Sequence, residues 1–119
     1  MSNPESHIQA HVWSTIGHLP GVRVFRNNVG TATTADGRFI RFGLCNGSSD
    51  LIGWTEYLIQ PEDVGRVVAV FTALEIKTKT GRATCQQQRF IEAVRNAGGI
   101  AGVVRSSEQA LQIIQDYQP

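Results

Sequence analysis

The residues of this chain with the clearest chemical potential are the acid and the base in the segment Leu74-Glu75-Ile76-Lys77. Side chains alternate between the two faces of a β-strand, so Glu75 and Lys77 are expected to share one face, with Ile76 on the other. The segment ends an apolar run, where an ion that leaves water loses much of its hydration energy. A carboxylate and an ammonium placed there indicate either a functional site or an ion pair at an exposed end or edge of a sheet.

A second acid, Asp50, follows the turn Gly47-Ser48-Ser49 and opens another apolar segment. If this segment neighbours the strand that carries Glu75, two carboxylates and a backbone carbonyl converge. Such oxygen ligands suit a hard divalent cation such as Mg²⁺, which also takes phosphate oxygens of a substrate. Lys77 beside them would lower the pKa of an attacking water and stabilise charge at phosphorus, as phosphodiester hydrolysis requires. The alternative for Asp50 is a residue that caps the turn.

Hydrophobic periodicity and turn residues predict the elements that must position these side chains. The predicted helices are residues 4–19, which Asn3 can cap, residues 84–97 and a last helix that begins at Ser106 or Ser107. The predicted strands are residues 22–26, 39–42, 50–54, 67–77 and 100–105. Residues 27–38 are predicted to form a loop, and the continuous apolarity that opens the 67–77 segment predicts a central strand buried on both faces. Thr84 and Gln87 fit a Thr-x-x-Gln capping box at the start of the second helix.

The order of these elements predicts an α/β fold with a mixed central sheet flanked by helices, because the final strand-helix-strand implies a parallel crossover. The 119 residues correspond to one domain, and 41% hydrophobic with 18% charged residues is typical of a chain that buries a core. The longest apolar run is far below the ~18–20 residues that cross a bilayer, and no leader opens the chain, so a soluble intracellular protein with no membrane partner is expected. Cys45 and Cys85 lack the spacing of a zinc or disulfide framework.

Several of these motifs together resemble one nuclease family. They are Gly47-Ser48-Ser49-Asp50-Leu51-Ile52-Gly53, Leu74-Glu75-Ile76-Lys77, Thr78-Lys79-Thr80-Gly81-Arg82-Ala83-Thr84, and Gln87 with Gly98-Gly99 downstream. The pattern is similar to the VRR-NUC (virus-type replication-repair nuclease) branch of the PD-(D/E)XK nuclease superfamily, and it spans most of the chain as a single domain, residues 1–119. The resemblance implies a restriction-endonuclease-like core of order α-β-β-β-α-β.

The resemblance also implies roles for individual residues. Asp50 and Glu75 would bind Mg²⁺ or Mn²⁺, the Ile76 carbonyl would complete the metal site, Lys77 would position the attacking water, and Gln87 would support the site. Gln87 is chosen over Gln86 and Gln88 by its spacing to Thr84 and Gly98. Ser49 stands where the superfamily often has proline.

Two further positions match the family pattern near the chain's start. Glu5 matches a family acid on the first helix near the metal, although an acid in a first helical turn is also favoured by the helix dipole. Arg26 and Asn27 match the family segment after the first strand and are candidates for phosphate contacts, which a simple turn explains equally well.

The charge of the chain is uneven along its length. Eleven basic and ten acidic residues give a formal charge of +1, which by itself disfavours a protein that coats nucleic acid. Residues 77–95, however, hold five basic residues and one acid, a local charge of +4; the basic residues are Lys77, Lys79, Arg82, Arg89 and Arg95. Lys79, Arg82 and Arg89 are therefore candidates for contacts to a nucleic-acid backbone. The alternative is a solvated helix face on which Arg89 pairs with Glu92.

The function expected from these patterns and the resemblance is a metal-dependent DNA endonuclease. Stand-alone versions of the family resemble enzymes that resolve Holliday junctions as homodimers, so a branched or four-way DNA partner and a bacterial or phage-infected cytoplasm are expected. A dimer supplies the two twofold-related active sites that paired cuts require. Other specificities, namely flap cleavage, nicking or end-processing, and a non-catalytic nucleic-acid-binding module on a nuclease fold stay open as alternatives.

Overall fold

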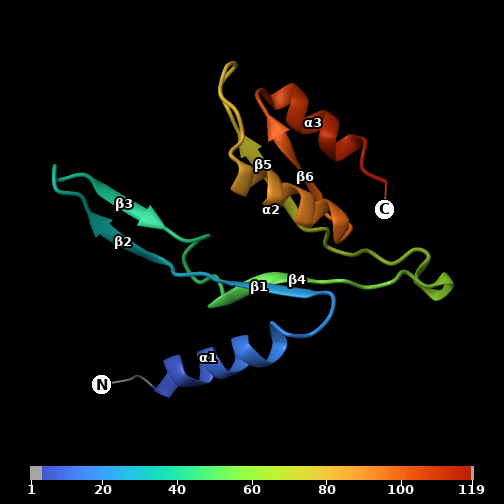
Figure 1. Ribbon diagram of the computed structural model, residues 1–119, viewed down its shortest axis with the longest axis horizontal. Helices are drawn as coiled ribbons and strands as arrows, with labels where there is room; N and C mark the ends of the chain where they lie inside the picture. The colour runs from blue at the N-terminus through green and yellow to red at the C-terminus, as the bar shows by residue number, and fades with distance from the viewer. Residues whose placement is uncertain (1–3, 119) are drawn as a thin grey trace. The chain divides into compact units, whose positions relative to one another are not determined.

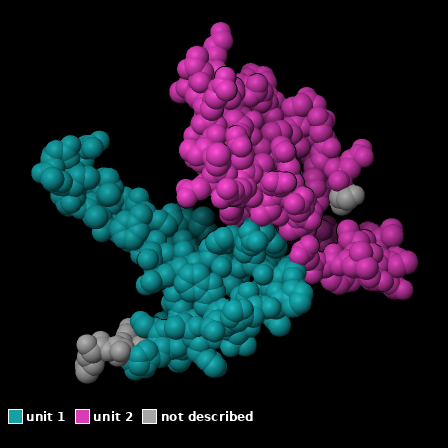
Figure 2. Space-filling model, in the orientation of Figure 1, with its two compact units in different colours: residues 1–55 teal, residues 56–119 magenta. Residues whose placement is uncertain are grey.

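The computed structural model describes residues 4–118. The chain divides into two compact units, residues 1–55 and residues 56–119, which we call the N-terminal and C-terminal units (Figure 2). The C-terminal unit contains the buried core, and residues predicted for the site occur in both units.

The N-terminal unit combines one helix with two pairs of strands (Figure 1). Its elements are α1 (Pro4–Ile16), β1 (Val22–Arg26), β2 (Gly30–Thr33), β3 (Phe39–Phe42) and β4 (Leu51–Thr55). β1 pairs with β4 in antiparallel register, so that Arg26 lies opposite Leu51. Gly53 is required in this pair, because a Cβ there would lie 1.8 Å from the Arg23 carbonyl oxygen. The predicted first helix and the strands at 22–26, 39–42 and 50–54 are confirmed within about three residues at their ends. The capping role of Asn3 lies outside the described residues.

The predicted loop over residues 27–38 is wrong in its middle, where β2 forms an antiparallel hairpin with β3. Thr31 and Thr33 are β-branched and suit a strand, but the polar composition of the segment had favoured a loop. The hairpin turn is closed by hydrogen bonds from the Thr34 and Gly37 amides to Arg38 and Thr34 carbonyls, and Gly37 has a φ of 84°. A two-stranded ribbon exposes many side chains, so its composition gives little of the alternation that identifies a half-buried strand.

The C-terminal unit is a strand-helix-strand-helix arrangement. Its elements are the 3₁₀ turn η1 (Pro61–Asp63), β5 (Thr72–Ile76), α2 (Cys85–Asn96), β6 (Ile100–Val104) and α3 (Ser107–Gln115). β5 and β6 pair in parallel, with Thr72 opposite Ile100 and Ile76 opposite Val104. The buried hydrophobic residues lie on α2 and β6: Ile91, Val94, Ile100, Ala101 and Val104. The predicted parallel crossover and the last two helices are confirmed.

The prediction of one long buried strand over residues 67–77 is wrong. Only residues 72–76 form β5, while the Val67 side chain is 98% exposed and Ile76 is 70% exposed. The reason is the length of the partner: the Phe71 carbonyl accepts from Ile100, and before Ile100 the chain turns away at Gly98, whose φ is 95°. Residues 67–70 therefore have no pairing partner in β6, although their residue types favour a β-strand.

The predicted single mixed sheet is also not confirmed. The described residues form three two-stranded sheets, β1 with β4, β2 with β3, and β5 with β6. Antiparallel and parallel pairing both occur, but in different sheets, and the order of elements has more strands than the α-β-β-β-α-β core. The architecture is a small α/β fold compatible with a nuclease. Among residues 4–118, none of the helices has the length and apolar character needed to cross a membrane.

Candidate active site

The centre of the candidate site is the pair of side chains at the end of β5. Lys77 Nζ lies 3.4 Å from Glu75 Oε1, which confirms that the two residues share one face of the strand. Both side chains are partly exposed, Lys77 by 21% and Glu75 by 32%. Partial exposure leaves the carboxylate within reach of a ligand from solvent.

Gln87 joins this pair from the first turn of α2. Its Nε2 donates to Glu75 Oε1 at 2.7 Å, while its Oε1 accepts from the Thr84 amide at 2.9 Å. Thr84 Oγ1 in turn accepts from the Gln87 amide at 3.1 Å, so the predicted capping box is present. Because the Thr84 amide can only donate, the carboxamide oxygen must face it, and the amide hydrogens must face Glu75. The helix cap thus determines which end of Gln87 reaches the carboxylate.

The neighbouring glutamines do not share this contact. Gln88 Nε2 donates to the Ala83 carbonyl instead, at 3.2 Å. Beside Glu75 and Gln87 a cavity of about 370 Å³ opens between β5 and α2. Its lining residues are Ala73, Leu74, Glu75, Gln86, Gln87, Phe90 and Ile91. Glu75 therefore helps to line a mainly apolar cavity, and its carboxylate accepts a hydrogen bond from Gln87 on the helix.

Asp50 belongs to the N-terminal unit, immediately before β4. Its carbonyl accepts from the Asn27 amide at 2.8 Å. The Asn27 side chain fastens the preceding turn: Nδ2 donates to Ser48 Oγ at 2.7 Å and to the Ser49 carbonyl at 2.9 Å, and Oδ1 accepts from the Leu44 amide. These bonds give Asn27 a positioning role for Asp50 that the sequence did not indicate, whereas the predicted contact of Arg26 and Asn27 with phosphate stays a prediction.

The other predicted acid, Glu5, lies in the first turn of α1, also in the N-terminal unit. Glu75, Lys77 and Gln87 belong to the C-terminal unit. The convergence of Asp50, Glu5 and the Ile76 carbonyl on Glu75 therefore stays a prediction. Within the described part of either unit, His, Cys, Asp and Glu residues do not gather in a group of three that could hold a metal ion.

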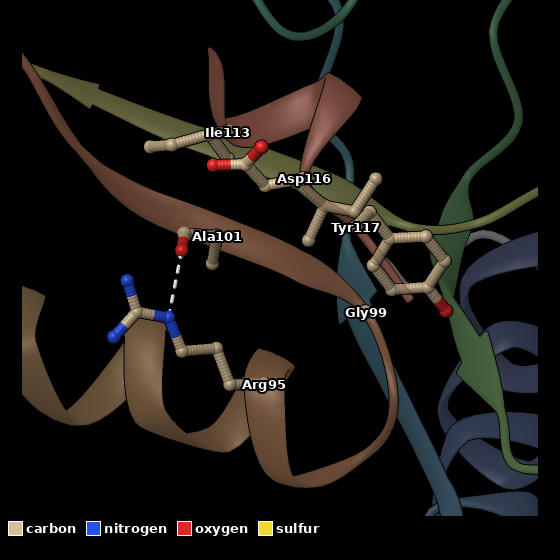
Figure 3. Close-up of a pocket in the computed structure, with 7 residues that line it drawn as sticks. Arg95, Gly99, Ala101, Ile113, Asp116 and Tyr117 are labelled. Carbon is tan, nitrogen blue, oxygen red and sulfur yellow. Dashed lines mark hydrogen bonds between the residues drawn. The ribbon is translucent and has the colours of Figure 1, made fainter. Parts of the chain in front are cut away.

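The basic residues of the 77–95 segment differ in what they contact. Lys79, Arg82 and Arg89 are exposed, as surface contacts to a nucleic-acid backbone require. Within residues 4–118 no salt bridge joins Arg89 to Glu92, so the pair that the alternative interpretation required is not formed. Arg95 instead donates its Nε to the Ala101 carbonyl at 2.8 Å, across a pocket that Asp116 and Tyr117 also line (Figure 3). Arg95 thus fastens α2 to β6.

Arg105, the residue that follows β6, was not among the site residues predicted from the sequence. Its guanidinium donates to the Thr78 and Gly81 carbonyls of the segment after Lys77. The available signal was the crossover itself: in a parallel pair, residues that follow the two strands emerge at the same edge. The strand ends at Ile76 and Val104 place Lys77 and Arg105 at that edge.

Replacing Gln87 with glutamate is expected to slow any reaction at Glu75 by roughly ten- to a hundredfold, the usual cost of changing a residue that orients a ligand. The new carboxylate would still cap α2, but it would place negative charge where the amide now donates, 2.7 Å from Glu75 Oε1. The two carboxylates would repel each other, so the Glu75 side chain would no longer be held in its present orientation. Cleavage rate and Mn²⁺ affinity measure the effect. Gln88→Glu is the matched control, and an equal loss in both variants would contradict this role.

The comparison with protein families identifies the chain. The family model described as the VRR-NUC domain matches residues 3–108, and this range includes all of the predicted site residues. Searches of curated proteins and of solved structures gave no match. The match confirms the family that the Gly-x-x-Asp and Glu-x-Lys motifs resemble. The chain therefore belongs to the VRR-NUC domain family, a nuclease family whose substrate is DNA.

Proposed function

We propose that this protein is a metal-dependent DNA endonuclease that cleaves branched DNA, such as a four-way junction, as a homodimer. The observation that carries the proposal is the arrangement of Glu75 between Lys77 Nζ at 3.4 Å and Gln87 Nε2 at 2.7 Å. An ion pair that served stability alone would not need a helix-cap glutamine aimed at the same oxygen. The family adds that the reaction is nuclease chemistry.

The donor set supports a hard divalent cation. Glu75 offers a partly exposed carboxylate and Ile76 a backbone carbonyl, and oxygen donors of this kind suit Mg²⁺ or Mn²⁺. Glu75 and Ile76, with Asp50 and Glu5 from the N-terminal unit, are the residues that would hold the ion. A bound cation would supply positive charge to the phosphate and lower the pKa of water.

The remaining side chains have roles that follow from their contacts. Lys77 holds a positive charge beside the carboxylate, where it orients a water by hydrogen bonding and stabilises the charge that develops on phosphate oxygens. Gln87 prevents the Glu75 carboxylate from rotating, because its own carboxamide is held by the Thr84 amide. Pre-organised groups of this kind cost no reorganisation when the reaction occurs.

The dimer and the preference for junctions rest on a geometric argument. A chain of 119 residues has one Glu-x-Lys motif, and symmetric cleavage of two strands needs two such sites related by a twofold axis. The exposed Lys79, Arg82 and Arg89 supply charge for backbone contacts that carry no base information. Selectivity for DNA shape is consistent with contacts of that kind.

Wild-type protein in Mg²⁺ is expected to cut a labelled four-way junction, and Lys77→Ala to cut it at least about a hundredfold more slowly. Chelator should stop cleavage by the wild type. Lys77→Arg is the matched variant that keeps the charge and is expected to recover part of the rate. Equal cleavage with Mg²⁺, with chelator and by Lys77→Ala would overturn the mechanism.

A panel of flap, nicked and blunt duplex substrates tests the specificity in the same assay. Faster cleavage of the junction, at paired symmetric positions, supports the proposed substrate class. Faster cleavage of a flap, nicked or blunt duplex substrate would show that this substrate, and not the junction, is the preferred one. Sedimentation of the protein with and without junction measures whether two copies act together.

A further inference from the structure

The residue that follows β6, Arg105, contacts the segment that follows β5. The Lys77 amide donates to the Val104 carbonyl at 3.1 Å, which continues the parallel ladder one residue beyond the strands. The backbone of Arg105 therefore lies beside that of Lys77, at the edge of the sheet where the candidate site lies. Its own amide donates to Gln109 Oε1 at 2.6 Å, so its backbone is held by the first turn of α3.

The guanidinium of Arg105 closes a turn. Nη1 donates to the Thr78 carbonyl and, at 2.6 Å, to the Gly81 carbonyl. The Gly81 amide also donates to the Thr78 carbonyl at 3.2 Å. We call residues 78–81, which these bonds hold together, the 78–81 turn. Two carbonyl oxygens that face the same point repel each other unless a cation lies between them, and a planar guanidinium with several donors meets that requirement.

The hydrogen bonds of Arg105 distinguish it from a surface arginine whose side chain extends into solvent without contacts to the protein. Within residues 56–118 its guanidinium has no carboxylate partner, and its hydrogen bonds go to main-chain carbonyls. The 78–81 turn in return exposes Lys79 and Thr80, and the exposed Arg82 follows it directly. Arg105 thus orders a short loop that carries one exposed cation, Lys79, and is followed directly by a second, Arg82.

We infer that Arg105 is a positioning residue, which holds the 78–81 turn so that Lys79 and Arg82 meet phosphates of the DNA backbone beside the Glu75–Lys77 pair. The inference rests on the proposed function for its DNA ligand, but the ordering of the turn is a property of the protein alone. A flexible lysine side chain contributes more to binding affinity when the backbone that carries it is already fixed, because less conformational entropy is lost when the complex forms.

The experiment compares wild type, Arg105→Ala, Lys79→Ala and the double variant in two measurements. Anisotropy with a labelled four-way junction in EDTA reports binding without cleavage. Arg105→Ala and Lys79→Ala are each expected to weaken binding by roughly tenfold, and the double variant by clearly less than the product of the two. The reason is that Lys79 contributes less to DNA binding once Arg105 no longer holds the turn that carries it. Independent, multiplicative losses would overturn the inference, since they would mean that Arg105 contacts DNA by itself.

Amide hydrogen exchange of residues 77–84 without DNA is the second measurement. Arg105→Ala should raise exchange there at least about tenfold, and Arg105→Lys should restore part of the protection, because an ammonium can still donate to carbonyls. Arg66→Ala removes an exposed arginine of the same unit, paired with Asp63, and serves as the control for lost charge. Unchanged exchange in Arg105→Ala would overturn the positioning role even if binding fell. Failure of wild type to bind any DNA would instead contradict the proposed function, and exchange would still decide whether Arg105 orders the turn.

Discussion

Replacement of Glu75 by glutamine is expected to lower the rate of DNA cleavage by at least about a thousandfold without unfolding the protein. The substitution keeps the shape of the side chain, and the amide oxygen can still accept from Gln87 Nε2. It removes the negative charge that pairs with Lys77 and that would hold the cation. A catalytic cation supplies several kcal/mol to the transition state, and about 1.4 kcal/mol corresponds to each factor of ten in rate.

The measurement is single-turnover cleavage of the four-way junction at saturating Mg²⁺, together with junction affinity in EDTA. Affinity should fall little or rise slightly, because a negative charge near the phosphates is lost. Glu92→Gln, an exposed glutamate of α2, is the matched control for the loss of one carboxylate. Cleavage by Glu75→Gln at the wild-type rate would rule out this carboxylate as the centre of the reaction.

Asp50→Asn is expected to produce a loss of similar size, about a thousandfold, although Asp50 belongs to a different unit from Glu75. The physical reason is that a divalent ion held by one carboxylate alone binds weakly, and the second carboxylate supplies much of the charge that offsets its lost hydration. The main-chain bond from the Asn27 amide to the Asp50 carbonyl does not involve the side chain, so β4 should keep its register.

This prediction tests whether the two units complete one site. Mn²⁺ affinity by electron paramagnetic resonance should fall in Asp50→Asn and in Glu75→Gln, and the double variant should lose little more than either. Asp36→Asn changes another exposed aspartate of the N-terminal unit; hydrogen bonds from Thr34 and Arg38 hold the pKa of Asp36 below its usual value, so its carboxylate is ionised at neutral pH in the wild type. Normal Mn²⁺ affinity and cleavage in Asp50→Asn would show that Asp50 only caps its turn.

The features that short-range physics controls were predictable from the sequence. The Thr84-x-x-Gln87 capping box depends on residues three apart, and the shared face of Glu75 and Lys77 depends only on the two-residue period of a strand. Gly98 as the end of α2 and the strand at 100–104 follow from equally local signals. These motifs were enough to indicate the nuclease family, which the family comparison confirmed.

The features that depend on a distant partner were decided by tertiary structure. Residues 67–70 have strong strand propensity, but β6 begins at Ile100 and offers them no partner residues. The polar segment at 30–33, in contrast, becomes a strand because residues 39–42 pair with it. The bond from Gln87 to Glu75 and the bonds from Arg105 to the 78–81 turn join residues 12 and more than 20 positions apart. Contacts between residues so far apart in the sequence depend on strand register and on which partner segments are available. Neither is encoded in the local pattern of hydrophobic and polar residues.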